Sequence, residues 1–524
     1  MLWLLLGARP DLSGACTTLV AGRLATADGS VMASHSNDGD GATAANLLLV
    51  PRAEWQLPAE RTVSNGQLPQ VARTYAYFTK VGGYASLNEH QVGLAESTCV
   101  AVFEGQRGAG AMLDIVDLSA LALERANSSR RAVETMGELA ERYGYYDAGE
   151  SLLVVDPTEA FIFHVLPDPS GTSAVWVAQR VPDSHVGVVA NSFTVREVDL
   201  HDGERFLYSR NMVDVALSQG RWGPGVPFDF TRIFAGPEPG HKYASGRRMW
   251  AAFRLLAPAA AERLSPWYSE YVSSAPYPAT LPASNVSSRS LRQVMRDYYE
   301  GTQFNLASGM AAGAFASPAR WSAPSNVSGN WERPIAISRT ILSYVLICRE
   351  WLPAAVGGVL WLAMHAAHTS VYSPFWAGMT TADSPLPEGY TVNAYSRVDR
   401  GVGAWQASRF VFNAAQLHFD EAIRQVRQAQ ELWESRAEAL LDRGVAEYVA
   451  GNATMAMLAN RTNAHAVAAV SAWWALSDDI MLSVAYPSVT YPAWWLDSTD
   501  VAFQDGPPPS PEVPPPPTVK IAQV

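Results

Sequence analysis

The chain has 524 residues, 48% of them hydrophobic and 17% charged, a composition typical of a globular protein with one large domain or two to three ordinary ones. A net charge of −12 without a clustered basic stripe argues against a nucleic-acid backbone as partner. Three cysteines (Cys16, Cys99 and Cys348) are too few for a disulfide scaffold, and the most apolar stretch, residues 343–368, is interrupted by charges and a proline, so we expect no transmembrane helix.

Residues 1–15 are predicted to be removed from the mature protein. Residues 1–6 are apolar, and Ser13-Gly14-Ala15 has the small-x-small pattern that a signal peptidase accepts. The apolar stretch is short and no basic residue precedes Arg9, so a signal peptide and a self-removed propeptide both remain open. Five Asn-x-Ser/Thr sequons are compatible with a secreted glycoprotein, or one in an endomembrane or lysosomal lumen, with the cytoplasm as the alternative: Asn127, Asn285, Asn326, Asn452 and Asn460.

Either kind of removal makes Cys16 the first residue. A terminal cysteine carries a nucleophile and a proton acceptor together, because the free α-amine titrates at about 7.7 to 8.0 and the thiol near 8.5. This combination predicts hydrolysis of an amide by an N-terminal nucleophile. The alternative is a small cysteine buried in a strand, since unpaired cysteine is commonly a core residue.

The first half of the chain predicts hairpins around one helical segment. Residues 16–21 and 30–36 read as strands joined through Asp28-Gly29, a dipeptide favoured in tight turns. This hairpin places Cys16 at a strand end, with His35 and Asp38 returning beside it. Apolar residues at helical spacing predict a helix over residues 117–143, which makes the fold class α+β with layers. Further strands are expected at residues 91–97, 151–156, 160–166, 174–181 and 186–193.

The second half is predicted to end in helices and a tail. Residues 404–481 have an apolar face at helical spacing. Residues 504–524 contain eight prolines and predict a disordered or polyproline II tail. The Pro- and Gly-rich residues 223–239 read as a long surface connection, so residues 16–503 are expected to form a single domain.

Several blocks, taken in order, resemble the N-terminal-nucleophile (Ntn) dipeptidase family, the dipeptidase A type to which secernins are related. The first is Cys16-Thr17-Thr18-Leu19-Val20-Ala21-Gly22 followed by Ala27-Asp28-Gly29-Ser30. The likeness covers roughly residues 16–503, and the ordered series is specific although each block alone is weak. The later blocks are residues 84–93, 123–145, 189–193, 299–302, 311–313, 318–321, 372–378 and 491–496.

The resemblance implies an αββα Ntn-hydrolase sandwich with helical C-terminal additions. It implies a cysteine-type exopeptidase that cleaves dipeptides or short peptides without a cofactor or metal ion. Cys16 attacks the scissile carbonyl, and its own α-amine takes the thiol proton and later passes it to the leaving amine. The side-chain amide of Asn191 and a backbone N–H near Asn88 are the implied donors to the oxyanion.

The resemblance also assigns charged residues to the site. Asp38 matches an acidic residue that hydrogen-bonds the α-amine or thiol region. His35 stands where many relatives carry arginine, which puts the proton-transfer details in doubt, because imidazole is not permanently charged. Arg339 is the first candidate for a permanent positive charge near the nucleophile, and Arg333 is the reserve.

Other groups of polar residues in the sequence do not indicate a metal site or a nucleotide-binding site. His35, Asp38 and Asp40 read as a hydrogen-bonded turn, and His365 and His368 lack the Glu of the helical zinc motif. Two alternatives to a dipeptidase stay open: an N-acyl amide hydrolase of the same fold, and a catalytically silent, Trp-rich secreted binding protein. The sequence leaves the oligomeric state open, a homo-oligomer included.

Overall fold

The computed structural model describes residues 16–39, 45–80, 83–105, 110–236, 243–270, 273, 275–309, 312–313, 315–319, 332–381, 385–392 and 400–484. Several predictions fall outside these residues in whole or in part: the removable leader 1–15, Asp40, the sequon at Asn326, residues 237–239 of the expected surface connection, residues 311, 320 and 321 of two family blocks, the block at 491–496 and the proline-rich tail 504–524.

The first sheet begins with the predicted hairpin. β1 (Thr17–Ala21) and β2 (Val31–Asp38) pair antiparallel, with Thr17 opposite Ser36. The turn forms because Gly29 adopts a φ of 85°, where a side chain would be strained, and because Asp28 accepts hydrogen bonds from Ser30 N and Oγ. Five more described strands complete the order β16-β14-β1-β2-β17-β18-β19: β14 (His185–Val189), β16 (Thr280–Pro282), β17 (Thr340–Cys348), β18 (Val359–Met364) and β19 (Ser373–Trp376).

The second sheet has eight described strands in the order β15-β13-β12-β11-β10-β9-β8-β3. They are β3 (Leu48–Val50), β8 (Tyr77–Thr79), β9 (Leu87–Asn88), β10 (Gly93–Cys99), β11 (Gly149–Val155), β12 (Ala160–Pro167), β13 (Ala174–Arg180) and β15 (Phe206–Tyr208). Two small ribbons lie beside it, β4 (Ala53–Glu54) with β7 (Arg73–Thr74) and β5 (Glu60–Val63) with β6 (Gly66–Pro69). The predicted central strands are therefore confirmed, although β14 ends at Val189 instead of residue 193.

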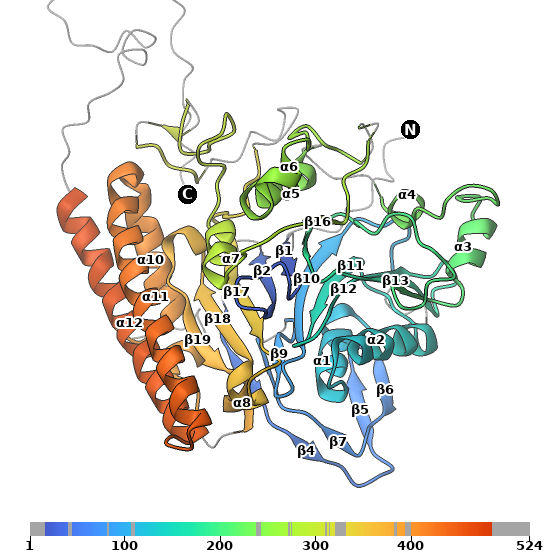
Figure 1. The fold of residues 1–524 in the computed structure, drawn as a ribbon, viewed down its shortest axis with the longest axis horizontal. Coiled ribbons are helices and arrows are strands. Elements are labelled where there is room, and N and C mark those ends of the chain that lie inside the picture. Colours follow the sequence, from blue (N-terminus) through green and yellow to red (C-terminus); the bar gives the residue numbers. More distant parts are fainter. Residues whose placement is uncertain are drawn as a thin grey trace, which may run out of the picture.

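Helices cover the outer faces of the two sheets (Figure 1). α1 (Ile115–Arg125) and α2 (Ser129–Tyr143) pack on the second sheet. The first sheet is covered by α5 (Ala244–Leu256), α7 (Ser288–Met295), α10 (Ala404–Gln416), α11 (Phe419–Val449) and α12 (Met455–Val484). The largest apolar cluster lies between the sheets and extends under these helices, so the αββα layers and the helical C-terminal additions are confirmed.

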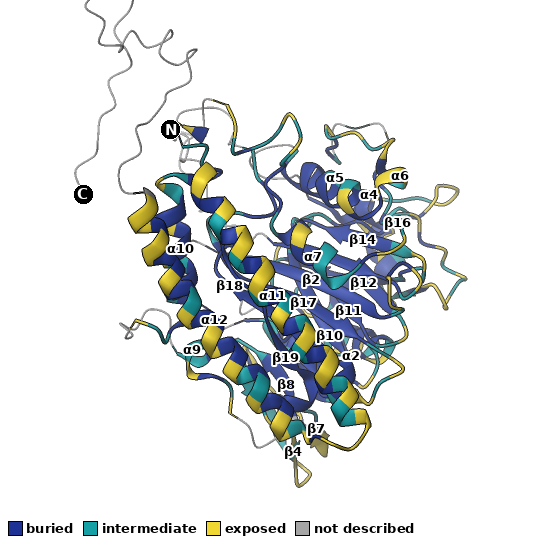
Figure 2. Cartoon of the chain, turned by 60° about the vertical axis from the view of Figure 1, so that its left-hand side comes forward, coloured by how far each residue is buried: buried dark blue, intermediate teal, exposed yellow. Residues whose placement is uncertain are grey.

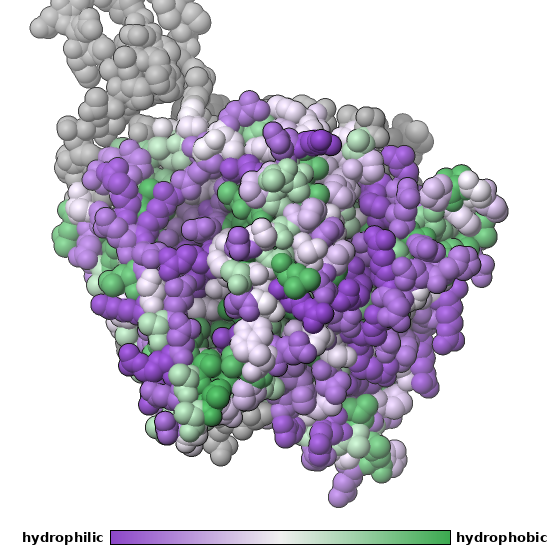
Figure 3. Space-filling model, in the orientation of Figure 1, coloured by the Kyte–Doolittle hydropathy of each residue, from purple (hydrophilic) through white to green (hydrophobic). Residues whose placement is uncertain are grey.

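Shorter helices connect the layers. They are α3 (Met212–Ser218), α4 (Phe230–Phe234), α6 (Pro258–Ala261), α8 (Ala354–Gly357), α9 (Glu388–Thr391) and the 3₁₀ turns η2 (Ala367–Thr369) and η3 (Ala377–Thr381). Figure 2 shows α11 and α12 with a buried stripe toward the sheet and an exposed stripe outside. On the face shown in Figure 3, apolar side chains form separate patches among hydrophilic ones.

One helical prediction was too coarse, and the helical C-terminal region is confirmed. The expected helix over 117–143 is two helices, because Ala126 is extended and Ser128 caps a new N-terminus by accepting from Arg131 N. The helical region from Ala404 breaks into three helices, with an extended φ at His418 and a left-handed Gly451 at the breaks. Residues 343–368 contain most of β17, the short helix α8, β18 and the start of η2. No helix of the described residues has the length and apolarity needed to cross a membrane.

Candidate active site

Cys16 directly precedes β1, and its backbone is held by several side chains. Its carbonyl oxygen accepts hydrogen bonds from Arg248 Nη1 at 2.9 Å and from Ser97 Oγ at 3.4 Å. The next residue, Thr17, donates its N–H to Ser36 Oγ at 3.2 Å. The Cys16 side chain is fully buried, and all three cysteines of the chain are free thiols. The predicted nucleophile is therefore fixed at a strand end between the two sheets.

The surroundings of the thiol favour its protonated form. Burial raises the pKa of Cys16 well above its usual value, and the negative charges of Glu96 and Asp38 raise it further. A hydrogen bond from the backbone of Asp38 acts in the opposite direction. Asn37 Nδ2 lies 3.8 Å from Sγ and donates to it. The thiol therefore needs a base before it can attack a carbonyl.

Arg248 joins Cys16 to the end of the neighbouring strand β14. This arginine lies on α5 and is 1% exposed. Nη1 donates to the Cys16 carbonyl and to Thr17 Oγ1, the latter at 3.0 Å. Nη2 donates to the Ala190 carbonyl at 3.2 Å and to Asn191 Oδ1 at 2.8 Å. One guanidinium thus sets the position of β1 relative to Asn191.

Asn191 lies beyond the end of β14 in a left-handed conformation, with a φ of 62°. Its N–H donates to Ser97 Oγ at 3.0 Å, and Ser97 is the residue that also bonds the Cys16 carbonyl. Its side-chain Nδ2 donates to the Thr98 carbonyl at 2.6 Å. An amide nitrogen carries two hydrogens, so one N–H bond can still be directed at a substrate oxyanion. The structure brings Asn191 into the site, and its oxyanion role stays a prediction.

Asp38, at the end of β2, is paired with Arg333 and not with Arg339. Its buried carboxylate accepts from Arg333 Nη2 at 2.8 Å and from Thr340 Oγ1 at 2.6 Å. Arg333 Nη1 also reaches Asn191 Oδ1, at 3.4 Å. Arg339 instead donates to the Gly39 carbonyl at 2.9 Å. The reserve candidate Arg333 therefore replaces Arg339 as the cation in contact with the predicted site residues.

His35 forms a hydrogen bond between the two sheets, and its surroundings favour the neutral imidazole. β9 pairs with β10 only at Gly93, which leaves carbonyls of β10 without a neighbouring strand there. His35 Nδ1 donates to the Glu96 carbonyl at 2.7 Å, and the Tyr344 hydroxyl donates to the Leu94 carbonyl at 2.7 Å. Burial lowers the pKa of His35 to about 3, and its ring stacks on Tyr344 with centroids 5.0 Å apart. The lowered pKa of His35 therefore disfavours the positive charge that an arginine would carry at this position.

Asn88 uses its own polar groups in local hydrogen bonds, and the backbone N–H expected near it as an oxyanion donor stays a prediction. Its N–H donates to the Val92 carbonyl at 3.0 Å, and its Oδ1 accepts from Val92 N and His90 N. Its Nδ2 donates to the carbonyls of Leu123 and Ala126 at the end of α1. The N–H and Nδ2 of Asn88 thus donate to backbone carbonyls in a turn and at a helix end, as asparagine commonly does.

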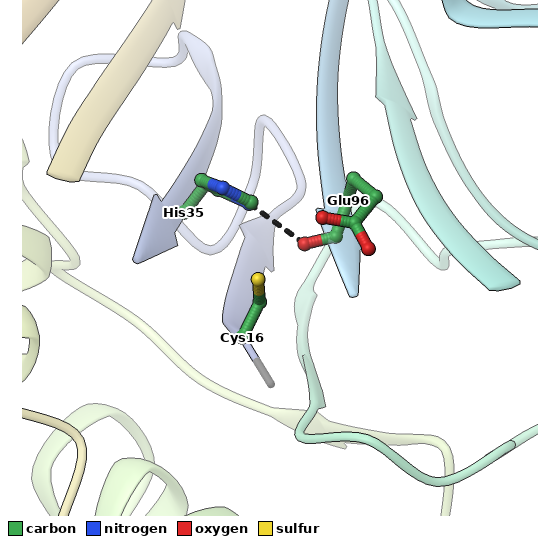
Figure 4. A group of neighbouring side chains, drawn as sticks. All are labelled: Cys16, His35 and Glu96. Carbon is green, nitrogen blue, oxygen red and sulfur yellow. Dashed lines mark hydrogen bonds between the residues drawn. The ribbon is translucent and has the colours of Figure 1, made fainter. Parts of the chain in front are cut away.

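Glu96 is a site residue that sequence reasoning missed. Figure 4 shows it beside Cys16 and His35, with its carbonyl accepting from His35. Donor atoms of these three side chains lie within 4.8 Å of one another, and all three residues are buried. Thiolate, imidazole and carboxylate are zinc ligands, and no other such group occurs among the described residues. If a metal ion bound here, it would occupy the nucleophile and block it.

Sequence reasoning missed both Glu96 and Arg248, and the sequence carried a signal only for Glu96. Glu96 is a charged residue inside a strand of otherwise apolar or small residues, and burial of a charge commonly marks a functional site. Arg248 follows Arg247 in an ordinary helix, and nothing local distinguishes it from a surface arginine. Only its contact with Cys16, 232 residues away in sequence, reveals its position.

Comparison with known proteins gives consistent matches. The model of peptidase family C69 matches residues 15–432. A probable dipeptidase of Salmonella dublin is 25% identical over 383 residues, covering 70% of this chain and 81% of the relative. Dipeptidase A of Lactobacillus helveticus is 21% identical over 390 residues, covering 70% and 76%. Among solved structures, penicillin V acylase from Agrobacterium tumefaciens aligns with 14% identity and a TM-score of 0.34, over 73% of this chain and 94% of that one.

Proposed function

The chain belongs to peptidase family C69, and on this premise we propose that it is a cysteine dipeptidase whose nucleophile is an N-terminal Cys16, freed by removal of residues 1–15. The observation that carries the proposal is the arrangement around Cys16. Asn191 and Arg248 bind one another there, and Arg248 also bonds the Cys16 carbonyl. The names of the related dipeptidases support the substrate class.

Acylation begins with proton transfer from the thiol. Because the raised pKa keeps the Cys16 thiol protonated, the free α-amine of the same residue takes the proton as sulfur attacks the scissile carbonyl. The carbonyl π electrons move to oxygen, and Asn191 stabilises the resulting oxyanion. The C–N bond then breaks, the protonated α-amine returns its proton to the leaving amine, and a thioester to Cys16 remains.

Deacylation uses the same groups, with water in place of the thiol as the nucleophile and the thiol in place of the amine as the leaving group. The α-amine takes a proton from water, and the hydroxide attacks the thioester carbonyl. A second oxyanion forms at Asn191, the C–S bond breaks, and the thiol recovers the proton from the α-amine. Asp38, held by Arg333 and Thr340, faces the thiol and acts as a positioning residue. Each cycle consumes one water and releases two amino acids.

The test combines maturation with the nucleophile. The active protein should have an intact mass that starts at Cys16, because an amine blocked by a leader cannot act as the base. Cys16→Ala should abolish turnover of a dipeptide panel, and Cys16→Ser should leave little activity because the hydroxyl is far less acidic. Cys99→Ala and Cys348→Ala are matched controls, since both thiols are buried and free, and they should remain active. Full activity with residues 1–15 retained would contradict the mechanism.

A further inference from the structure

Two buried carboxyl groups lie side by side next to the nucleophile. Glu96 on β10 and Glu150 on β11 are 0% and 2% exposed. Thr98 pairs with Glu150 in the register, so Glu96, two residues from Thr98, points to the same face as Glu150. Glu96 Oε1 accepts from Thr98 Oγ1 at 2.9 Å. In the described part of the chain, no N–H or hydroxyl donates to Oε2 of Glu96 or of Glu150.

The two carboxyl groups interact, and Glu150 is the more readily protonated of the two. Burial raises the pKa of both, the charge of Glu96 raises that of Glu150 further, and the contact between them lowers the pKa of Glu96. Around them, Asp147 and Cys99 face Glu150, while Cys16 and Lys80 face Glu96. Lys80 acts on Glu96 only through its charge, and neither carboxyl forms an ion pair with a described arginine or lysine. A negative charge on Glu96 would be costly here without a cation, and a substrate cation beside its unpartnered Oε2 would offset that cost.

The distance to the nucleophile identifies that cation. A Glu96 carboxylate oxygen lies within 4.8 Å of Cys16 Sγ. The α-nitrogen of a substrate's first residue is about 2.5 Å from the carbonyl carbon that Cys16 attacks. That carbon stands roughly 3 to 3.5 Å from the attacking atom, and an ammonium donates to a carboxylate at about 2.7 to 2.9 Å. A substrate can therefore place its carbonyl carbon against Cys16 Sγ and its α-ammonium against the Glu96 carboxylate at the same time, because these three lengths together span the distance between the two side chains.

We propose that Glu96, hydrogen-bonded by Glu150 and Thr98, binds the free α-ammonium of the first residue of the substrate. The inference rests on the proposed dipeptidase function and adds the chemical class that the enzyme selects, a substrate with an unblocked amino terminus. An N-acylated substrate brings no cation and leaves the Glu96 carboxylate unpaired. The site therefore favours dipeptides over N-acyl amides.

The kinetic test compares a dipeptide such as leucyl-alanine with its N-acetyl derivative. The mature wild-type enzyme should prefer the free amine by roughly a hundredfold or more in kcat/KM, because a site built for a polar group rejects a substrate that lacks it. Glu96→Gln should lose most of this preference, because it should slow the free dipeptide far more than the N-acetyl compound. Glu138→Gln is the control, since this α2 side chain is 62% exposed, and it should match the wild type.

Three outcomes contradict the proposal in distinguishable ways. Equal losses on both substrates in Glu96→Gln would mean that Glu96 serves the Cys16 amine or the fold. A wild-type preference that survives Glu96→Gln would locate ammonium recognition elsewhere and leave the dipeptidase function standing. Wild-type enzyme that cleaves only the N-acetyl substrate would remove the dipeptidase function together with this inference.

A binding experiment separates recognition from catalysis. Mature Cys16→Ala protein, titrated calorimetrically, should bind leucyl-alanine more tightly than N-acetyl-leucyl-alanine, and adding Glu96→Gln should abolish the difference. Glu150→Gln is the second variant, because its amide still donates to Glu96 and should preserve the preference. Circular dichroism and a thermal melt of each variant report folding. Loss of the preference in folded Glu150→Gln but not in folded Glu96→Gln would overturn the assignment.

Discussion

Replacement of Arg248 by lysine should cost both stability and turnover. The guanidinium donates to at least five acceptors, the carbonyl of Ala244 in its own helix and four atoms around the nucleophile. A lysine ammonium has three donors on a single atom, so at least two of these acceptors lose their partner. A buried acceptor left unsatisfied costs about 1–3 kcal/mol, so the free energy of unfolding should fall by roughly 2–6 kcal/mol.

The effect on turnover follows from the acceptors involved. Two of them are the Cys16 carbonyl and Asn191 Oδ1, so the nucleophile and the predicted oxyanion donor lose their common support. We expect kcat on a dipeptide to fall by about a hundredfold, the loss typical of a disturbed oxyanion donor. Thermal melts and steady-state kinetics measure the two effects, and Arg131→Lys on the exposed side of α2 is the matched control. Wild-type kcat and melting temperature in Arg248→Lys would refute this account of the site.

Four further outcomes are expected. Asn191→Ala should lower kcat by about a hundredfold to a thousandfold with little change in KM, because the bond strengthens as charge appears on the oxyanion; steady-state kinetics with a melt as folding control decide it. Arg333→Met should reduce kcat more than Arg339→Met, because Arg333 donates to the Asp38 carboxylate whereas Arg339 donates to the Gly39 carbonyl; equal losses would remove this distinction. The pKa of His35 falls from 6.5 when unfolded to about 3 when folded, so its contribution to stability is complete above pH 6.5 and is lost as pH falls toward 3. In urea unfolding at a series of pH values, a folded His35→Gln protein should lose less stability over that window than the wild type. Prolonged EDTA treatment should leave turnover intact, since the proposed chemistry uses thiol and amine; activity restored only by an added metal ion would contradict it.

Local sequence determined the parts of the site that lie near one another in the chain. Asp28-Gly29 specifies the tight turn, and the turn with its alternating strands aligns Cys16 with the end of β2 and hence with Asp38. The helix break after residue 125 also had a local cause, the Ser128 cap, although periodicity alone did not reveal it. For Asn88, the structure shows local hydrogen bonds, and the oxyanion donor that the family resemblance implies near it stays a prediction.

Tertiary packing decided which charges meet the nucleophile. Arg248 and Arg333 lie 232 and 295 residues from the Cys16 and Asp38 atoms that they bind, and periodicity within a helix or a loop carries no information about such pairs. Glu96 and Glu150 meet because of the register of β10 with β11, and Glu96 reaches Cys16 because the two sheets pack face to face. The sequence by itself thus predicted Cys16 as the nucleophile, which stays a prediction, and the αββα layers, which are confirmed, because both follow from short-range patterns and from an ordered series of family blocks. The electrostatics of the site arise only when distant segments are desolvated together, because the energy of a buried charge depends on every neighbour that the fold brings to it.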